Sequence, residues 1–387
     1  MTTLDWITKL IAFDTTSRLS NLSMIEYLAN ALNDHHITPI LIHDPKAPKA
    51  NLLATLPGRN ACMKGGIILS GHTDTVPVDG QLWDSNPFQA LIKNDNVYGR
   101  GACDMKGFIA VIMSLIPKFK ALKLDFPIHF AFSYDEELGC LGAGHLIDKI
   151  KSLNYQPQAC IVGEPTSMLP VIAHKGIRAY RCQIHGVSAH SSLTDQGCNA
   201  IEHAAVLINF LREAANQFKT HGVQDSSYDV PYTTLSTNLI SGGNAQNTIP
   251  NLCEFFFEFR HLATDNADTL HQKIVSFIDD HLLPSMHKEQ KNSQVVLEIL
   301  SKVPDLDMAL SEKIVQAALA LCKSNKPSKV AYATEAGLFQ QADIPTIVCG
   351  PGSIEQAHRA NEYVALEQLH DCEQFIMNLM LDSCLSA

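Results

Sequence analysis

The sequence has little that would suit a nucleic acid or a membrane as a partner. Its 40 acidic and 29 basic residues give a formal net charge of −11, and no run of Lys or Arg forms a basic patch. No apolar stretch is long enough to span a bilayer. Residues 1–6 lack the basic start and the apolar core of a secretory signal. We therefore expect a soluble, cytoplasmic protein that binds neither nucleic acid nor membrane.

The sequence also has no Cys-X-X-Cys pair. Its 11 cysteines are an odd number scattered along 387 residues, which favours reduced thiols over a disulfide framework or a thiolate zinc site. We find no internal repeat and no low-complexity segment. With 46% hydrophobic and 18% charged residues, the chain has the balance of a globular protein and the length for two domains with a large core.

A short apolar run at 67–71 ends in His72, and Asp74 follows two positions later. Glycines precede the run and a polar tail follows it, which is typical of a buried strand that leads into a loop. In open α/β sheets, ligands bind outside the carboxyl ends of the strands. A His at such an end, with a carboxylate that can fix its tautomer, is the usual arrangement of a metal ligand. The alternative is a His that is hydrogen-bonded within a loop.

Three further strand-like runs also lead into acidic or imidazole side chains. A charge at the end of one buried strand is common, but its recurrence at successive strand ends favours a shared site. The runs are 128–134 before Glu136 and Glu137, 159–163 before Glu164, and 344–352 before His358.

Asp104 lies in a glycine-rich stretch, 97–107, just before an apolar helical face that begins at Phe108. It therefore stands at the N-terminus of the expected helix. An Asp at this place either caps the helix by accepting backbone hydrogen bonds or adds a further acidic ligand to the strand-end residues. Its position alone favours the cap.

Together, these side chains are imidazoles and carboxylates without a thiolate, a set that suits one or two divalent ions such as Zn²⁺. If Asp104 bridges, its two oxygens can hold two ions about 3.5–4 Å apart, with a water whose pKa falls toward about 7. One carboxylate must stay off the ions to accept the proton of that water. Glu136 and Glu137 can divide these tasks because adjacent side chains point in different directions. The residues alone thus predict a metal-assisted hydrolase.

The pattern changes after residue 176. Residues 179–186 alternate in polarity with period two, as a half-exposed antiparallel strand does. The following order of elements predicts a small α+β unit inserted into a larger α/β domain. The expected elements are a helix at 199–214, strands at 233–240 and 252–259, a helix at 267–283 and, beyond the polar stretch 288–293, helices of the larger domain at 310–323 and 365–382.

Four motifs carry a resemblance over essentially the whole chain: Ser70–Pro77, Gly99–Gly107, Asp135–Glu137 and Gly163–Thr166. In this order they resemble the dinuclear zinc aminoacylase and exopeptidase family, which also contains succinyl-diaminopimelate desuccinylase. The resemblance implies a zinc-exopeptidase-like α/β catalytic domain, with a mixed sheet flanked by helices. It also implies an inserted ferredoxin-like domain for dimerisation and closure. We expect the catalytic domain at 1–177 and 287–387, the inserted domain at 178–286, and a homodimer.

The same resemblance implies two Zn²⁺ ions per subunit, for which Co²⁺ can substitute. The implied roles are His72 and Glu164 on one ion, Glu137 and His358 on the other, Asp104 as the bridge, Asp74 as the partner of His72, and Glu136 as the general base.

Within the family, residues 173–176, 332–336 and 349–358 resemble the members that hydrolyse N2-acetyl-L-ornithine to L-ornithine and acetate in arginine biosynthesis. Ala333 replaces a Cys found in many members, which bears only on fine substrate preference. One alternative is another N-acyl-amino-acid amidohydrolase such as the desuccinylase, which would need a second cationic patch. The other is a non-catalytic metal-binding scaffold, against which the complete set of ligands and base argues.

Four residues outside the strand-end cluster also receive expected roles, the first three from the resemblance and Glu335 as a separate hypothesis. His190 would reach the partner subunit's site and stabilise the tetrahedral oxyanion through an imidazole N–H. Asn247 and Arg260 would bind substrate, since the planar fork of an Arg suits an α-carboxylate. The alternative for Arg260 is a structural role at a strand end. Glu335 would be the counter-ion of the distal ammonium of the substrate.

Overall fold

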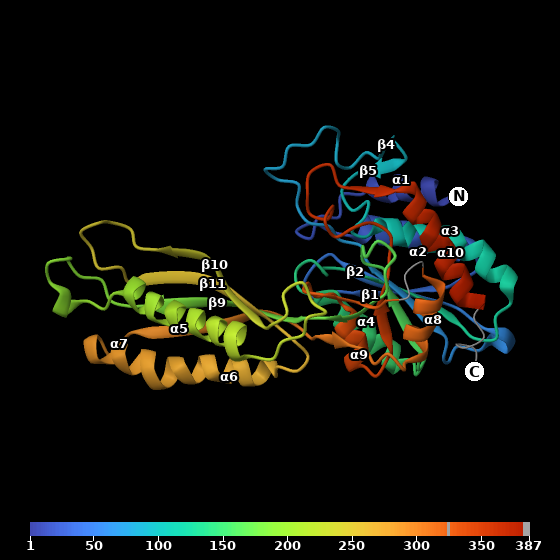
Figure 1. Ribbon diagram of the computed structural model, residues 1–387. Coiled ribbons are helices and arrows are strands. Elements are labelled where there is room, and N and C mark those ends of the chain that lie inside the picture. The colour runs from blue at the N-terminus through green and yellow to red at the C-terminus, as the bar shows by residue number, and fades with distance from the viewer. Residues whose placement is uncertain (323–325, 382–387) are drawn as a thin grey trace. The chain divides into compact units, whose positions relative to one another are not determined.

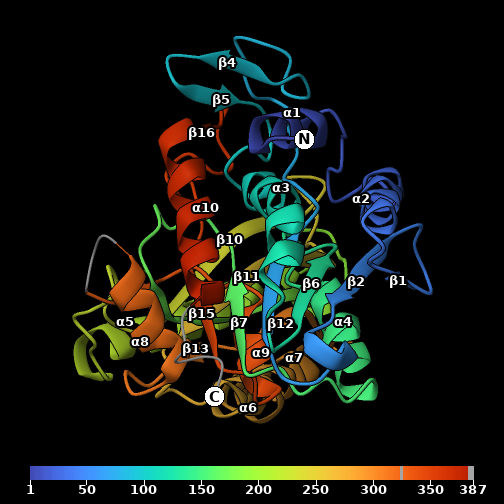
Figure 2. The same cartoon turned by 90° about the vertical axis from the view of Figure 1, so that its right-hand side faces the viewer.

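The computed structural model describes residues 1–322 and 326–381, and the contacts within the chain divide it into two units. The first unit comprises Met1–Ala173, Leu306–Lys329 and Thr334–Ala387, and the second comprises His174–Asp305 and Val330–Ala333. Two views of the chain are given in Figure 1 and Figure 2. Residues 323 and 382, the expected last residues of two helices, lie outside the described ranges.

The first unit is built on a mixed sheet with the strand order β1-β2-β6-β3-β7-β15-β8-β13, and β14 pairs with β8. The central strands β6, β3, β7 and β15 are parallel to one another, whereas β1, β2 and β8 join them in antiparallel pairs. The strands are β1 (Pro39–His43), β2 (Ala50–Leu56), β3 (Ile67–His72), β6 (Ile128–Ser133), β7 (Ala159–Val162), β8 (Val171–His174), β13 (Leu306–Asp307), β14 (Ser328–Val330) and β15 (Thr346–Val348).

Helices cover this sheet above and below the strands in the view of Figure 1. In one layer, α3 packs against α1 and α10, and in the other α4 packs against α9. Because both faces are covered, β3 and β6 are buried at every position, which explains their continuous apolar sequences. The helices are α1 (Thr3–Ile11), α2 (Leu22–Asp34), α3 (Lys106–Leu122), α4 (Leu141–Ser152), α8 (Lys313–Leu321), α9 (Ala336–Gln341) and α10 (Leu366–Leu381).

A small separate sheet in the first unit has the order β16-β5-β4. Its strands are β4 (Leu91–Lys93), β5 (Asn96–Tyr98) and β16 (Tyr363–Ala365). Within the described ranges of the whole chain, no helix combines the length and the apolar character needed to cross a membrane.

The second unit is an antiparallel sheet in the order β10-β11-β9-β12, with its helices packed on it. β9 and β11 bury every second residue, which confirms the alternation seen in the sequence, and these residues form a core with α5 and α6. The order β-α-β-β-α-β is ferredoxin-like. The elements are β9 (Gly176–His185), α5 (Ala200–His221), β10 (Thr234–Gly242), β11 (Leu252–His261), α6 (Ala267–Phe277), a π-helix (Ile278–Leu282), α7 (Leu283–Glu289) and β12 (Gln294–Val303).

The contacts extend the second unit beyond the boundary expected at residue 286. β12 pairs with β9 along its whole length and completes the sheet, so residues 287–305 belong to the second unit. The polar stretch 288–293 comprises the last two residues of α7 and its connection to β12, and it is not the return to the larger domain. The second unit also begins at His174, before the expected boundary at residue 178.

Candidate metal centre

The carboxyl ends of three neighbouring parallel strands bring the expected side chains together. His72 is the last residue of β3, Glu136 and Glu137 follow β6, and Glu164 follows β7. β3 lies between β6 and β7, so these ends meet at one edge of the sheet. This is the edge at which open α/β sheets bind their ligands.

Asp104 lies between the two imidazoles of the cluster. Its Oδ1 is 2.8 Å from His72 Nε2, and its Oδ2 is 3.3 Å from His358 Nε2. The side chain does not cap α3, because Met105 occupies the N-cap position and no side-chain capping bond is present there. Asp104 therefore directs both oxygens into the cluster, as a bridging ligand requires, and the interpretation as an N-cap is wrong.

The imidazole and carboxylate atoms that could hold a metal ion form two overlapping groups, each within 4.8 Å: His72 with Glu136 and Glu164, and His72 with Asp104 and Glu137. His358 joins the second group, with its Nε2 3.0 Å from Glu137 Oε2. Glu164 Oε1 is buried 3.6 Å from His72 Nε2 and has no hydrogen-bond partner. A buried carboxylate oxygen without a partner is rare, and this one fits a cation bound beside His72.

The excess of carboxylates shifts the pKa values of the cluster. Burial, followed by the charge of Asp104, raises the pKa of Glu164 to about 8. Burial and Glu164 raise the pKa of Glu136 well above its usual value. Hydrogen bonds to Asp104 and Glu137 raise the pKa of His358 to about 10. All three shifts show that the cluster favours added positive charge, which divalent ions would supply, so the residues present fit a metal centre.

Asp74 ties the end of β3 to the loop after β6. Its Oδ1 accepts a hydrogen bond from the backbone N of Glu136 at 3.1 Å, and its Oδ2 accepts one from Glu137 N at 3.3 Å. His72 Nδ1 donates to the backbone carbonyl of Asp74 at 3.0 Å, which leaves Nε2 of His72 directed into the cluster. Asp74 thus orients the imidazole through its main chain and both glutamates through its side chain.

A family model described as Peptidase family M20/M25/M40 matches residues 68–382, a span that includes the whole strand-end cluster. The chain belongs to this family. The resemblance drawn from the sequence motifs is confirmed.

Relatives in the M20 family that match nearly the whole chain are named acetylornithine deacetylase. The protein from Photorhabdus laumondii is 35% identical over 376 residues, which cover 97% of this chain and 94% of that protein. The protein from Pasteurella multocida is 34% identical over 367 residues, which cover 94% and 92%.

Solved structures of the M20 family share the fold. A metallo-carboxypeptidase from Sulfolobus solfataricus has a TM-score of 0.77 and 16% identity, with 98% of each chain covered. A dinuclear metal binding peptidase from Bacillus subtilis has a TM-score of 0.64 and 15% identity, with 98% of this chain and 96% of that chain covered. At these identities the likeness concerns the fold alone, and it confirms the expected architecture.

Two residues to which the M20 resemblance gives roles in catalysis and binding, His190 and Asn247, lie side by side in the second unit. Both are exposed, and the backbone N of Ser191 donates to the backbone O of Asn247 at 3.0 Å. His190 Nδ1 is 2.8 Å from Ser192 Oγ, so its Nε2 remains available. The structure therefore presents both residues on one exposed loop pair, and their roles toward substrate stay predictions.

Arg260 and Glu335 have partners within the protein. Arg260 Nε donates to Glu258 Oε1 at 2.8 Å on β11, and its side chain is one-third exposed. Glu335 is fully buried, and its two oxygens accept hydrogen bonds from Ser70 Oγ at 2.6 Å and Ser133 Oγ at 2.7 Å. This burial favours a role in holding β3 and β6 and speaks against direct contact with a substrate ammonium, so the predicted counter-ion needs a direct test.

Glu362 is a positioning residue that sequence reasoning missed. Its Oε1 accepts hydrogen bonds from the backbone N atoms of Cys103 and Asp104 at 2.9 and 3.1 Å. Its Oε2 accepts from Gly101 N and from Arg100 Nη1 at 2.9 and 2.8 Å. This buried carboxylate holds the loop that presents Asp104. The available signal was Arg100 in the glycine-rich motif, since a buried Arg requires an acidic partner.

Proposed function

We propose that the protein is a metal-dependent amidohydrolase that removes the acetyl group from N2-acetyl-L-ornithine and releases L-ornithine and acetate. The observation that carries the proposal is the match to acetylornithine deacetylases at 34 to 35% identity over at least 92% of each relative. The convergence of all the expected ligand side chains on one sheet edge supports it.

The proposed cofactor is a pair of divalent ions, Zn²⁺ with Co²⁺ as a substitute. When bound, the ions would supply a water of lowered pKa and polarise the carbonyl of the substrate. Asp104 would bridge the ions, because its two oxygens face His72 and His358. The remaining ligands would be Glu164 beside His72 and Glu137 beside His358.

Glu136 is the proposed general base and acid. It accepts the proton of the attacking water as the oxygen adds to the amide carbon, and it returns the proton to the amine nitrogen as the C–N bond breaks. The raised pKa of its buried carboxyl suits this exchange, because the proton must bind and leave in one turnover. Asp74 supports the role by holding the backbone N–H of Glu136.

The proposed substrate contacts come from the second unit. Arg260 would bind the α-carboxylate through its guanidinium, Asn247 would contact the substrate, and His190 would stabilise the oxyanion in the site of a partner subunit. The exposure of His190 and Asn247 supports these roles. We further propose a homodimer that acts in the cytoplasm. All cysteines in the described ranges are free thiols, as a reducing compartment would keep them.

A side-by-side hydrolysis assay tests the function. The purified protein, loaded with Zn²⁺ or Co²⁺, would be given N2-acetyl-L-ornithine, N-succinyl-diaminopimelate and N-acetyl-L-methionine. We expect kcat/KM to be at least about tenfold higher on the first substrate, since a site built for a polar group discriminates against analogues that lack it. A preference for another substrate would contradict the assignment of the pocket. Inactivity on all three substrates with metal bound would contradict the proposal that the protein is an amidohydrolase.

A further inference from the structure

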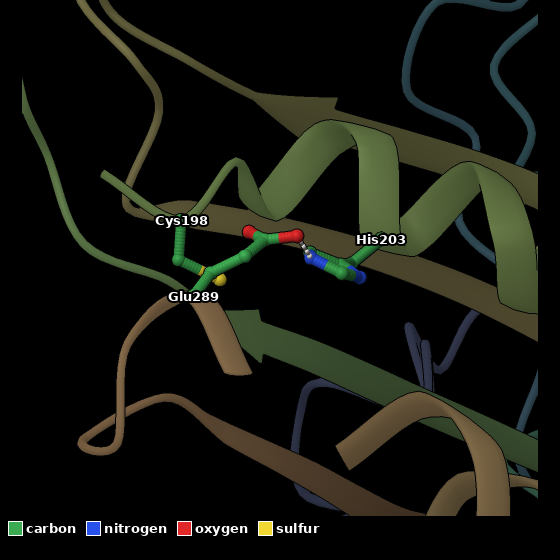
Figure 3. Close-up of side chains that lie close together, drawn as sticks. All are labelled: Cys198, His203 and Glu289. Atoms are coloured by element: carbon green, nitrogen blue, oxygen red, sulfur yellow. Dashed lines mark hydrogen bonds and ion pairs between the residues drawn. The ribbon is translucent and has the colours of Figure 1, made fainter. Parts of the chain in front are cut away.

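A second group of metal-ligand side chains lies wholly within the second unit. One sulfur, nitrogen or oxygen atom from each of Cys198, His203 and Glu289 lies within 4.8 Å of the others. Figure 3 shows the thiol and the imidazole on either side of the carboxylate. His203 Nε2 is 3.0 Å from Glu289 Oε1. Cys198 precedes α5, His203 lies in the first turn of α5, and Glu289 is the last residue of α7.

Two of these side chains are buried and the third is half-exposed. Cys198 is 1% exposed, and it exchanges two backbone hydrogen bonds with Val187, at 3.0 and 2.9 Å. His203 is 7% exposed on the helix that begins beside Cys198. The side chain of Glu289 is 46% exposed, so its carboxylate can move toward a ligand without disturbing the core.

The hydrogen bond between His203 and Glu289 does not account for the other polar atoms at this place. Burial raises the pKa of the Cys198 thiol, a hydrogen bond with the Ser293 hydroxyl lowers it, and the Glu289 carboxylate raises it further. Ser293 is 2% exposed, and its Oγ has no hydrogen-bond partner apart from this thiol. A thiol, an imidazole, a carboxylate and a buried hydroxyl therefore lie together, where each can serve as a donor to one cation.

We propose that Cys198, His203 and Glu289 bind one divalent ion of the Zn²⁺ class, which ties the start of α5 to the end of α7. One thiolate, one imidazole and one carboxylate suit a borderline-soft ion, and a fourth position remains for water or Ser293. Ligand atoms in a tetrahedral zinc site are about 3.5 Å apart, so a small movement of Glu289 and Cys198 completes the geometry.

The site has a route for the ion and a proton to release. Glu289 lines a cavity of about 830 Å³ together with Gly197 and Asn199, the two neighbours of Cys198. The ion bonds to sulfur as the thiol proton leaves to solvent, so its affinity increases with pH. This site is independent of the proposed hydrolysis, because none of its ligands belongs to the strand-end cluster.

Cobalt distinguishes this site from the strand-end cluster. A thiolate ligand gives Co²⁺ an intense charge-transfer band in the near ultraviolet, which imidazole and carboxylate ligands do not. We expect metal-free protein titrated with Co²⁺ to develop this band. Cys198→Ser should lose the band and bind one ion fewer per chain in equilibrium dialysis. Cys103→Ser, beside Asp104, should keep the band, as should Cys182→Ala, which alters another buried thiol of the second unit.

Glu289→Gln is the variant that guards against misfolding, because it changes a half-exposed side chain. It should fold like the wild type and weaken the Co²⁺ affinity measured from the thiolate band by at least tenfold. Absence of the band in the wild type, or its survival in Cys198→Ser, would overturn the proposal. Unchanged affinity in Glu289→Gln would also overturn it. None of these outcomes bears on the hydrolysis assay, since absorbance and ion stoichiometry are measured without substrate.

Discussion

Glu136 and Glu137 are adjacent in the chain, yet the structure places their carboxylates in different surroundings. Glu137 Oε2 is 3.0 Å from His358 Nε2, whereas Glu136 Oε1 accepts a weak hydrogen bond from Cys140 Sγ at 3.5 Å. Asp74 holds both backbone N–H groups, so neither side chain can exchange places with the other. This separation supports one glutamate as a ligand and the other as the base.

Replacement of the base should abolish turnover and spare the metal. We expect Glu136→Gln to lower kcat by about 10²–10⁴-fold, because an amide cannot accept the proton of the water. The metal content, measured by elemental analysis, should stay at the wild-type value. Glu137→Gln is the matched control, and it should lose metal as well as activity. Near-normal turnover in Glu136→Gln would show that another group is the base.

Substitution of Glu335 tests whether this buried carboxylate binds the distal ammonium of the substrate. Glu335→Gln removes the charge but keeps the hydrogen bonds, because the hydroxyls of Ser70 and Ser133 can rotate to accept from the new amide. We expect the KM for N2-acetyl-L-ornithine to stay within about twofold of wild type, as suits a residue that only supports the strands. A large rise in KM, absent with N-acetyl-L-methionine, would restore the counter-ion role.

His129, on β6, should make the first unit sensitive to acid. Burial lowers the pKa of this imidazole to about 4, from an ordinary value of 6.5. As the pH falls from 6.5 to 4, the unfolded chain binds a proton at this imidazole and the folded chain does not. The free energy of unfolding therefore decreases. The loss should reach roughly 1–3 kcal/mol near pH 4 and level off below it.

The comparison of wild type with His129→Gln measures this effect. The variant keeps a donor for the Gly65 carbonyl, which His129 Nε2 contacts at 2.9 Å, but it cannot titrate. Its deficit in Tm relative to wild type should therefore shrink as the pH is lowered from 7.5 to 4.5. A deficit that is constant over this range would contradict the assignment.

At the scale of elements, the close approach of Gly163, the residue after β7, to α3 positions two proposed ligands. A Cβ on Gly163 would lie 2.0 Å from the ring of Phe108, in the first turn of α3. Gly163→Ala must therefore push α3, and Asp104 before it, away from Glu164. We expect a loss of about 1–3 kcal/mol in stability from this overpacking, together with weaker metal binding.

Gly144→Ala is the matched control for this substitution. Gly144 lies on α4, and nothing is within 4 Å of a Cβ placed there. Alanine in an open helical position should leave stability unchanged or raise it by up to about 1 kcal/mol. Thermal unfolding and metal titration of both variants check the pair. Normal metal affinity in Gly163→Ala would show that the packing of Gly163 against Phe108 does not position the ligands of the centre.

At the scale of the whole molecule, the proposed role of His190 requires two subunits. In a dimer that exchanges this residue, Glu136→Gln and His190→Asn damage different parts of one composite site. Each variant alone should be nearly inactive. Mixed and allowed to exchange subunits, they should recover about a quarter of wild-type activity, because half of the dimers would carry one intact site. If no activity is recovered although mass spectrometry verifies subunit exchange, His190 acts in the site of its own chain.

The predictability of the fold depended in part on the length of each element. The strand at 128–134 and the alternating strands β9 and β11 were predicted because each has enough residues to show a period. β4, β5 and β16 were missed because three residues show none. β12 was missed because the polar connection before it was interpreted as the end of the inserted domain. A connection within a domain has the same composition as one between domains.

The sequence by itself determined the strand-end residues and the family. Parallel strands must bring their carboxyl ends to one edge, so local patterns were enough to place His72, Glu136 and Glu164 together. The position of Asp104 favoured a cap on α3, whereas the tertiary structure places its carboxylate facing both imidazoles. Only the tertiary structure brought Cys198 to Glu289, which lies far along the chain. Such contacts depend on how distant segments pack, and they cannot be predicted from the local periodicity or propensity of the sequence.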